Sequence, residues 1–324
     1  MTIKRNKGAT VRCFVVVNPR AGASLDIPNF GQHVRGLFEA AAIQADFADP
    51  DIELDRQIEA AMASDAPIIA VAGGDGTVMA VVQAMMGTPK KLAILPAGTM
   101  NVLAHEVGLP MDLSKAVRLV EEGGSRLIDV GEVNGHYFLG NSMLGAPSRL
   151  AKRREGFRGR SSGRGYLDLV RAGIRALRRY PAMGLVVETG GDRRPVETRA
   201  LVVAVNDYEE GVGKVMTRAS LDAGELVVYA LKPVTPLRVL GLMLAVLLGR
   251  WRHDQRLLRL EVEDTVRITA RRKRVRVMND GETLLLTPPL TYRLHPGALE
   301  VIVPKMEPAV EPSDPSATVA SVGS

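Results

Sequence analysis

The stretch IIAVAGGDGT, residues 68–77, decides the fold of the N-terminal part of this 324-residue chain. Its first five residues form a continuous apolar run, which is typical of a strand buried on both faces of a parallel sheet. Glycines follow at once, and a helical pattern begins at Val78. The sequence therefore predicts a strand, a glycine-rich loop and a helix. The loop lies at the carboxyl edge of the strand, where open α/β sheets bind ligands.

The residue types in the loop Gly73-Gly74-Asp75-Gly76-Thr77 suit phosphate chemistry. Glycines lack a Cβ and let the backbone approach phosphate oxygens, while the helix N-terminus offers unpaired N–H donors. Thr77 is a candidate N-cap or phosphate donor. Asp75 would repel a phosphate unless a metal or a hydroxyl lies between them, which indicates Mg²⁺-linked phosphoryl transfer. Taken alone, the five residues fit a plain turn capped by Asp75 equally well.

Two further loops favour a binding site over a plain turn. Asn18-Pro19-Arg20-Ala21-Gly22 follows a strand predicted over Val11–Asn18, and Pro96-Ala97-Gly98-Thr99-Met100-Asn101 follows one predicted over Leu92–Leu95. Strands that alternate with helices pair in parallel, so all three loops are expected at one edge of the same sheet. This shared edge indicates a ligand site rather than three unrelated turns.

The two parts of the chain differ in pattern. Residues 1–128 predict an α/β domain, with a parallel sheet and helices on both faces. Residues 129–305 carry mostly strand patterns, beginning with a hairpin at Asn134-Gly135 and ending with a strand over Ala298–Val303. They predict an antiparallel, β-rich domain. Residues 306–324 lack periodicity and predict a disordered tail.

The motifs NPRAG (18–22), GGDGT (73–77) and LPAGTMNVLAHEVGLP (95–110) together resemble a known family. They are similar to the catalytic domain of diacylglycerol kinases, sphingosine kinases and their bacterial lipid-kinase relatives, over about Val11–Val303. The resemblance implies an N-terminal domain similar to that of phosphofructokinase and NAD kinase, a C-terminal β-sandwich domain that takes the lipid acceptor, and an active site between them. It also implies ATP and Mg²⁺ as cofactors, and phosphoryl transfer to the hydroxyl of diacylglycerol or a related lipid in phospholipid biosynthesis.

The same resemblance implies which residues lie near the nucleotide. They come from the three loops and are Asn18, Gly22, Gly73, Gly74, Asp75, Gly76, Thr77, Thr99 and Asn101. The chain departs from the family at Val102, where the usual Gly-Thr-x-Asn-Asp pattern has its second acidic residue.

Carboxylates in the second domain are candidates for the remaining roles. Asn279-Asp280-Gly281-Glu282 separates two predicted strands and by itself is typical of a hairpin turn. The resemblance implies that its Asp-Gly-Glu motif supplies the base, because a lipid hydroxyl must lose its proton to a nearby carboxylate. Glu282 and Asp280 both remain candidates, with Asp75 as a further catalytic carboxylate. Asp222 matches a segment that holds a structural Mg²⁺ in some bacterial relatives, although Ala223 replaces its second Asp.

Positive charge is concentrated in one segment. Between Arg149 and Arg179 there are eleven Lys/Arg and two acidic residues, in a chain of net charge +6. A helical pattern over residues 165–180 places Arg164, Arg171, Arg175 and Arg178 on a basic face. This face fits either transient contact with anionic lipid headgroups or plain solvation. The longest apolar run, residues 239–249, is shorter than the ~20 residues that span a bilayer. We expect a cytoplasmic protein, peripheral at the inner membrane face, and leave a homodimer open.

Three alternatives remain on the sequence alone. NAD kinases share GGDGT but carry a later Asn-Glu pair, and this chain has no Asn-Glu dipeptide. A relative without catalytic activity that only binds lipid or nucleotide would not need both GGDGT and NDGE. A nucleic-acid-binding module could use the basic segment, but few aromatic residues accompany it for base stacking, so we expect no nucleic acid partner.

Overall fold

The computed structural model describes residues 12–22, 25, 27–49, 52–145, 182–212, 217–233, 235–252 and 254–305. The predicted helix over 165–180, with Arg164, Arg171, Arg175 and Arg178, lies outside the described residues, as does the predicted tail over 306–324.

The N-terminal part is built on four parallel strands in the order β2-β1-β3-β4. They are β1 (Arg12–Val17), β2 (Gln44–Phe47), β3 (Ile68–Gly73) and β4 (Lys91–Pro96). β3 is buried along its whole length, as its unbroken apolar run predicts. Because the strands are parallel, the loops that follow β1, β3 and β4 leave from the same edge of the sheet.

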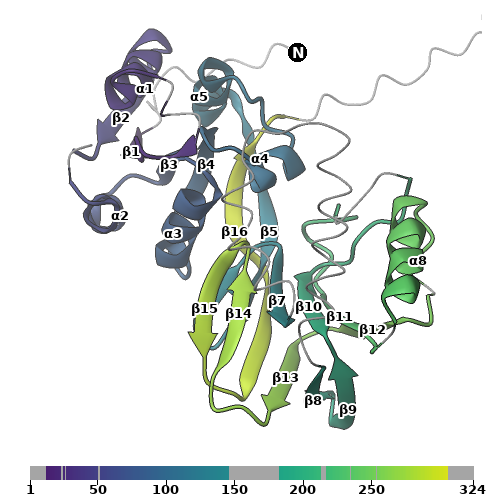
Figure 1. Cartoon of the computed structure of the whole chain (residues 1–324). Coiled ribbons are helices and arrows are strands. Elements are labelled where there is room, and N and C mark those ends of the chain that lie inside the picture. The colour runs from purple at the N-terminus through teal and green to yellow at the C-terminus, as the bar shows by residue number, and fades with distance from the viewer. Residues whose placement is uncertain are drawn as a thin grey trace, which may run out of the picture.

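Helices cover both faces of this sheet, as predicted (Figure 1). α1 (Phe30–Ala40) and α5 (Leu113–Glu122) bury their apolar residues against one face. α2 (Leu54–Ala63), α3 (Asp75–Met85) and α4 (Val102–Glu106) pack on the other. Each face has its own apolar core, because alternate residues of the central strands point to opposite sides.

The C-terminal part is a sandwich of two mostly antiparallel layers, so the predicted fold class is confirmed. One layer continues the first sheet through β5 (Gly124–Val133), β6 (His136–Phe138), β8 (Met183–Thr189), β9 (Asp192–Thr198), β13 (Thr265–Ala270) and β16 (Leu290–Val303). The other layer contains β7 (Asn141–Gly145), β10 (Ala200–Val205), β11 (Leu226–Leu231), β12 (Leu257–Val262), β14 (Val275–Asn279) and β15 (Glu282–Leu286). Their inner faces share one apolar core.

Outside the second layer lies α8 (Pro236–Leu247) (Figure 1). Among the described residues, no helix has both the length and the apolar character that crossing a bilayer requires.

β16 belongs to both parts of the molecule. Its first residues pair with β13, while Val301 pairs in parallel with Leu92 of β4, so one ten-stranded sheet runs through both parts. The sequence predicted only its end, over Ala298–Val303, because Pro296 and Gly297 interrupt the strand pattern before it. Here the strand carries a bulge between His295 and Leu299 and continues. The predicted domain boundary at residue 128 lies inside β5.

Two edge strands were not predicted from the sequence, β2 and β9. β9 exposes four successive residues, Asp192–Pro195, and β2 buries none of its residues fully. An edge strand needs little apolar surface and tolerates proline and charge, so neither segment shows a strand pattern.

Asp129 in β5 binds both the bulge of β16 and the turn that contains Gly224. Its side chain is only 2% exposed. One carboxylate oxygen accepts the N–H of Gly297 in the bulge at 2.8 Å, and the other accepts the N–H of Gly224 at 2.8 Å. Both donors lie in tight backbone turns with positive φ, at +57° and +76°, and the carboxylate satisfies both.

We therefore expect Asp129→Ala to lower the free energy of unfolding by about 2–5 kcal/mol, because two half-buried N–H groups lose their acceptor. Urea unfolding followed by circular dichroism measures the change. Asp264→Ala, which removes an exposed carboxylate from a nearby turn, is the matched control and should change stability little. Equal effects of the two substitutions would contradict this role for Asp129.

Candidate active site

The three predicted loops form one packed unit at the carboxyl edge of β1, β3 and β4. A methyl group on Gly98 would lie 2.5 Å from Gly74 Cα, and one on Gly22 would lie 2.8 Å from the Thr99 backbone nitrogen. Such distances exclude a Cβ, so glycine is required for the backbones to touch. The structure thus brings together Gly22, Gly74, Gly98 and Thr99, as the shared edge predicted.

Asn18 and Thr77 lie beneath this edge. Asn18 Nδ2 donates to Thr77 Oγ1 at 2.8 Å, while Asn18 Oδ1 accepts the N–H of Arg20 at 3.0 Å. Thr77 is buried, and its side chain fills the space where a Cβ on Gly73 would lie. The N-cap of α3 is Gly74, so the predicted alternative of Thr77 as N-cap is wrong. No side chain caps α3 at Gly74, which leaves its first N–H groups directed at the loop edge.

Asp75 and Asn101 connect the second loop to the third. Asp75 Oδ1 accepts the N–H of Val102, the first residue of α4, at 2.6 Å. Asn101, at φ +47°, pairs its side-chain amide with the N–H and carbonyl of Gly98, at 2.8 and 3.0 Å. The carboxylate of one loop therefore caps the helix of the next, at the end where the helix dipole favours negative charge.

The NDGE motif forms the turn between β14 and β15. Asp280 and Gly281 both have positive φ, at +44° and +95°, as a two-residue hairpin turn requires. The Asp280 carboxylate accepts backbone N–H groups from Leu139, Gly140 and Asn141, at 2.6, 2.9 and 2.9 Å. Burial raises the pKa of Asp280, and the three donors oppose that rise. Its carboxylate is occupied in holding residues 139–141.

Glu282 differs from Asp280 in its surroundings. Its side chain is exposed, and the described residues place no hydrogen bond on its carboxylate. A methyl group on Gly76 would lie 3.2 Å from Glu282 Oε1, so the carboxylate faces the first turn of α3. Partial burial and the neighbouring Asp280 charge both raise the pKa of Glu282. Thus a carboxylate from the second part of the molecule meets the GGDGT loop from the first.

An ion pair that the sequence did not predict holds the two parts in this arrangement. The buried Arg218 guanidinium donates to both Glu106 oxygens, at 2.8 and 2.5 Å, and to the Leu139 carbonyl, at 2.5 Å. Glu106 ends α4, and Leu139 belongs to the segment that Asp280 binds. The partners are 112 positions apart in the sequence, and no motif surrounds Arg218, so there is no local signal from which to find the pair.

Asp222, the predicted metal ligand, is bound by Arg126 and Ser220. Arg126 Nη2 donates to Asp222 Oδ1 at 2.8 Å, and the Ser220 hydroxyl donates to the same oxygen. The Arg126 guanidinium, followed by Ser220, lowers the pKa of Asp222. Within the described ranges no three His, Cys, Asp or Glu side chains are grouped to hold a metal. These partners suit an ion pair, and the residues present do not fit a structural metal site at Asp222.

Both parts of the chain match known protein families. Residues 12–133 match the family described as diacylglycerol kinase catalytic domain. Residues 145–303 match the family described as YegS C-terminal NAD kinase beta sandwich-like domain.

Individual relatives agree with these matches. A diacylglycerol kinase of Staphylococcus carnosus is 33% identical over 135 residues, which cover 40% of this chain and 43% of that protein. One of Staphylococcus aureus is 25% identical over 224 residues, 66% of this chain and 68% of that protein. Two solved structures of Bacillus anthracis proteins, each described as a putative diacylglycerol kinase, share the fold. Their TM-scores are 0.68 and 0.69 at 19% and 18% identity, with 91% and 92% of this chain and 98% of each of those chains covered.

The contact between Gly98 and Gly74 gives a test of the packed edge. We expect Gly98→Ala to weaken ATP binding at least about tenfold, because the added Cβ must push the two loops apart. Isothermal titration with ATP and Mg²⁺ measures the affinity. Gly36→Ala is the control, since a Cβ there meets nothing within 4 Å in α1 and should raise stability by about 0.5–1 kcal/mol. Unchanged ATP affinity in Gly98→Ala would contradict a nucleotide site at this edge.

Proposed function

We propose that this chain, which belongs to the diacylglycerol kinase-like family of bacterial lipid kinases, transfers the γ-phosphoryl group of ATP to a lipid hydroxyl. One observation carries the proposal: Glu282 of the NDGE turn faces Gly76 in the GGDGT loop. This contact puts a carboxylate within reach of the place where a phosphate bound by the loop would end.

In this proposal the nucleotide binds at the three packed loops that follow β1, β3 and β4. Backbone that no Cβ shields, together with the uncapped N-terminus of α3, suits the phosphates of ATP. ATP supplies the phosphoryl group when it is bound. Asp75 would hold a phosphate-bound Mg²⁺ through the oxygen that Val102 does not use, since Mg²⁺ commonly binds one or two carboxylates and the substrate phosphates. Asn18 and Asn101 would keep the loops in register.

The acceptor half of the site is Glu282. Its raised pKa moves the carboxylate toward the pH range in which a general base works well. We assign Glu282 the acceptance of the lipid hydroxyl proton as that oxygen bonds to the phosphoryl group. Asp280 has a different role in this proposal. Its three N–H partners make it the group that fixes the turn from which Glu282 projects.

The acceptor we propose is diacylglycerol, because the curated relatives carry that name. Phosphatidylglycerol, a sphingoid base and ceramide also present a hydroxyl beside an apolar tail. NAD⁺ is the runner-up acceptor, since the C-terminal family is described by its likeness to NAD kinase. Incubation with [γ-³²P]ATP, Mg²⁺ and each acceptor separates these alternatives, and the proposal fails if no lipid is labelled.

We expect Glu282→Gln to lower kcat by a factor on the order of 10²–10⁴, because the hydroxyl loses its proton acceptor. The melting temperature should not change, since the carboxylate supports no described hydrogen bond. Glu263→Gln, an exposed glutamate in the turn before β13, is the matched control and should keep full activity. Asp280→Asn should lower the melting temperature, because the Asp280 carboxylate bonds three backbone N–H groups.

The pH profile gives an independent readout of the same group. A carboxylate with a raised pKa is protonated, and unable to act as a base, at a higher pH than an ordinary glutamate. The wild-type kcat should therefore fall as the pH drops through that raised pKa, and the residual activity of Glu282→Gln should lack this step. A variant that retains both the rate and the step would show that Glu282 is not the base.

A further inference from the structure

α8 is an apolar helix whose described side chains are partly packed on the protein and partly exposed. Its twelve residues, PLRVLGLMLAVL, include a single charged one. Leu242, Ala245 and Val246 pack on a cluster formed by strand residues and Trp251. Leu244 and Leu248, four residues apart and so on one helix face, are 57% and 51% exposed. A helix that is apolar all round is normally covered on every side, and this one leaves leucines in water.

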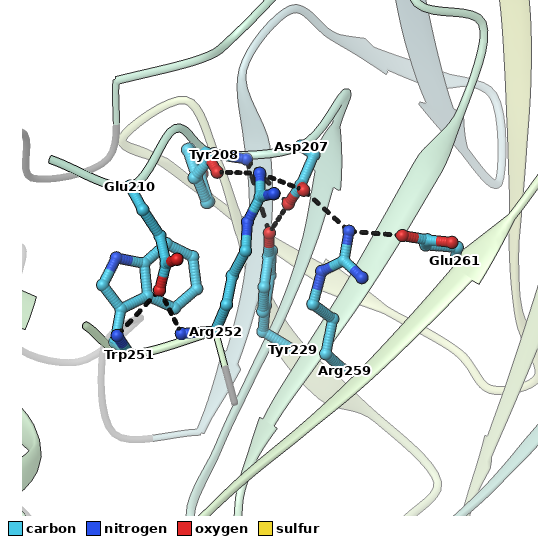
Figure 2. A network of polar contacts seen from close by, with 8 residues as sticks. All are labelled: Asp207, Tyr208, Glu210, Tyr229, Trp251, Arg252, Arg259 and Glu261. Carbon is cyan, nitrogen blue, oxygen red and sulfur yellow. Dashed lines mark hydrogen bonds and ion pairs between the residues drawn. The ribbon is translucent and has the colours of Figure 1, made fainter. Parts of the chain in front are cut away.

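The segment that follows α8 is bound by the polar network of Figure 2. Glu210 accepts the N–H groups of Trp251 and Arg252, just beyond the helix end, at 2.8 and 2.6 Å. Arg252 in turn pairs with Asp207 at 2.5 Å, and Asp207 also bonds Arg259 and the Tyr229 hydroxyl. The residues just beyond the C-terminal end of α8 are therefore tied to the segment around Asp207 and Glu210.

A second apolar residue from another segment lies beside the same helix end. Gly249, at φ +64°, packs so closely on Gly211 that a Cβ on it would lie 2.5 Å from the Gly211 carbonyl carbon. The next residue, Val212, is 81% exposed. Leu244, Leu248 and Val212 together are called the α8 patch below. Exposed apolar residues gathered at one place mark an interaction surface more often than residues scattered singly.

Two exposed arginines lie on and beside α8, whereas Arg252 is neutralised by Asp207. Residues 232–252 contain four cations, Lys232, Arg238, Arg250 and Arg252, and no acidic residue. Arg238 and Arg250 are exposed. The nearest acids are engaged: Asp254 pairs with Arg256, and Glu210 binds the two N–H groups described above. Exposed leucines among unopposed arginines suit a surface that offers both apolar chains and negative charge.

We propose that the α8 patch docks the protein on an anionic phospholipid bilayer. The leucines enter the boundary between headgroups and acyl chains, while Arg238 and Arg250 meet the phosphates. The proposal rests on the proposed function, because a kinase whose acceptor is a lipid must work at a bilayer surface. It concerns a surface separate from Arg164, Arg171, Arg175 and Arg178, for which contact with headgroups stays a prediction.

Vesicle binding tests the α8 patch directly. The full chain is sedimented with vesicles of phosphatidylglycerol and phosphatidylcholine, or of phosphatidylcholine alone. Leu244→Glu combined with Leu248→Glu should lower the partition coefficient on the anionic vesicles by at least about tenfold. Leu127→Glu on β5 is the matched control, with a leucine that is 55% exposed, and should bind like the wild type. Arg238→Gln with Arg250→Gln should bring binding on anionic vesicles down toward the phosphatidylcholine level.

Kinase activity measured on micelles and on vesicles distinguishes membrane docking through the α8 patch from the kinase function itself. The double leucine variant should phosphorylate diacylglycerol in detergent micelles at the wild-type rate and lose activity on vesicles. A wild type that binds anionic vesicles but labels no lipid defeats the kinase function and leaves the docking surface standing.

Two results would overturn the docking proposal. One is equal vesicle partition of the double leucine variant and the wild type. The other is a wild-type dimer, measured by light scattering, that the double leucine variant converts to a monomer, because the patch would then join two copies of the chain. A similar melting temperature for all variants excludes misfolding as the cause.

Discussion

The site depends on the way one buried carboxylate, that of Asp280, is satisfied by three backbone N–H groups. A carboxylate removed from water without partners is costly, so the turn can be stable only where residues 139–141 present those donors. This requirement fixes the NDGE turn against a segment far away in sequence, and Glu282 follows two residues later. The buried carboxylate of Asp129 is satisfied in the same way, because it accepts the N–H groups of Gly224 and Gly297.

Arg218 extends this constraint to the GGDGT loop of the N-terminal part. It binds the Leu139 carbonyl on one side and the Glu106 carboxylate on the other, and Glu106 ends the short helix that Asp75 caps at its start. A continuous set of polar contacts therefore runs from the GGDGT loop through α4 to the NDGE turn. Loss of one partner of a buried pair costs about 3–5 kcal/mol, much more than an exposed pair contributes. These contacts connect Asp75 to the turn that carries Glu282.

Features that depend on neighbouring residues or on a periodic pattern could be predicted from the sequence. The apolar run of β3, the glycine loop after it and the Asn134-Gly135 turn are each encoded within a few residues, so the α/β fold and the packed glycine loops could be predicted. The edge strands β2 and β9 lack an apolar pattern because they bury little, and β16 is interrupted by a bulge. The choice between Asp280 and Glu282 depends on donors 140 residues away, and no spacing in the sequence reports them.

The pairing of Val301 with Leu92 has a consequence for how the chain reaches this structure. The free edge of β4 acquires its neighbour from a strand some 200 residues further along, so the parallel sheet and the sandwich share hydrogen bonds. Contacts of such sequence separation carry a large loop-closure cost and form late. The two parts that the family matches separate are thus expected to gain stability together, in one cooperative transition.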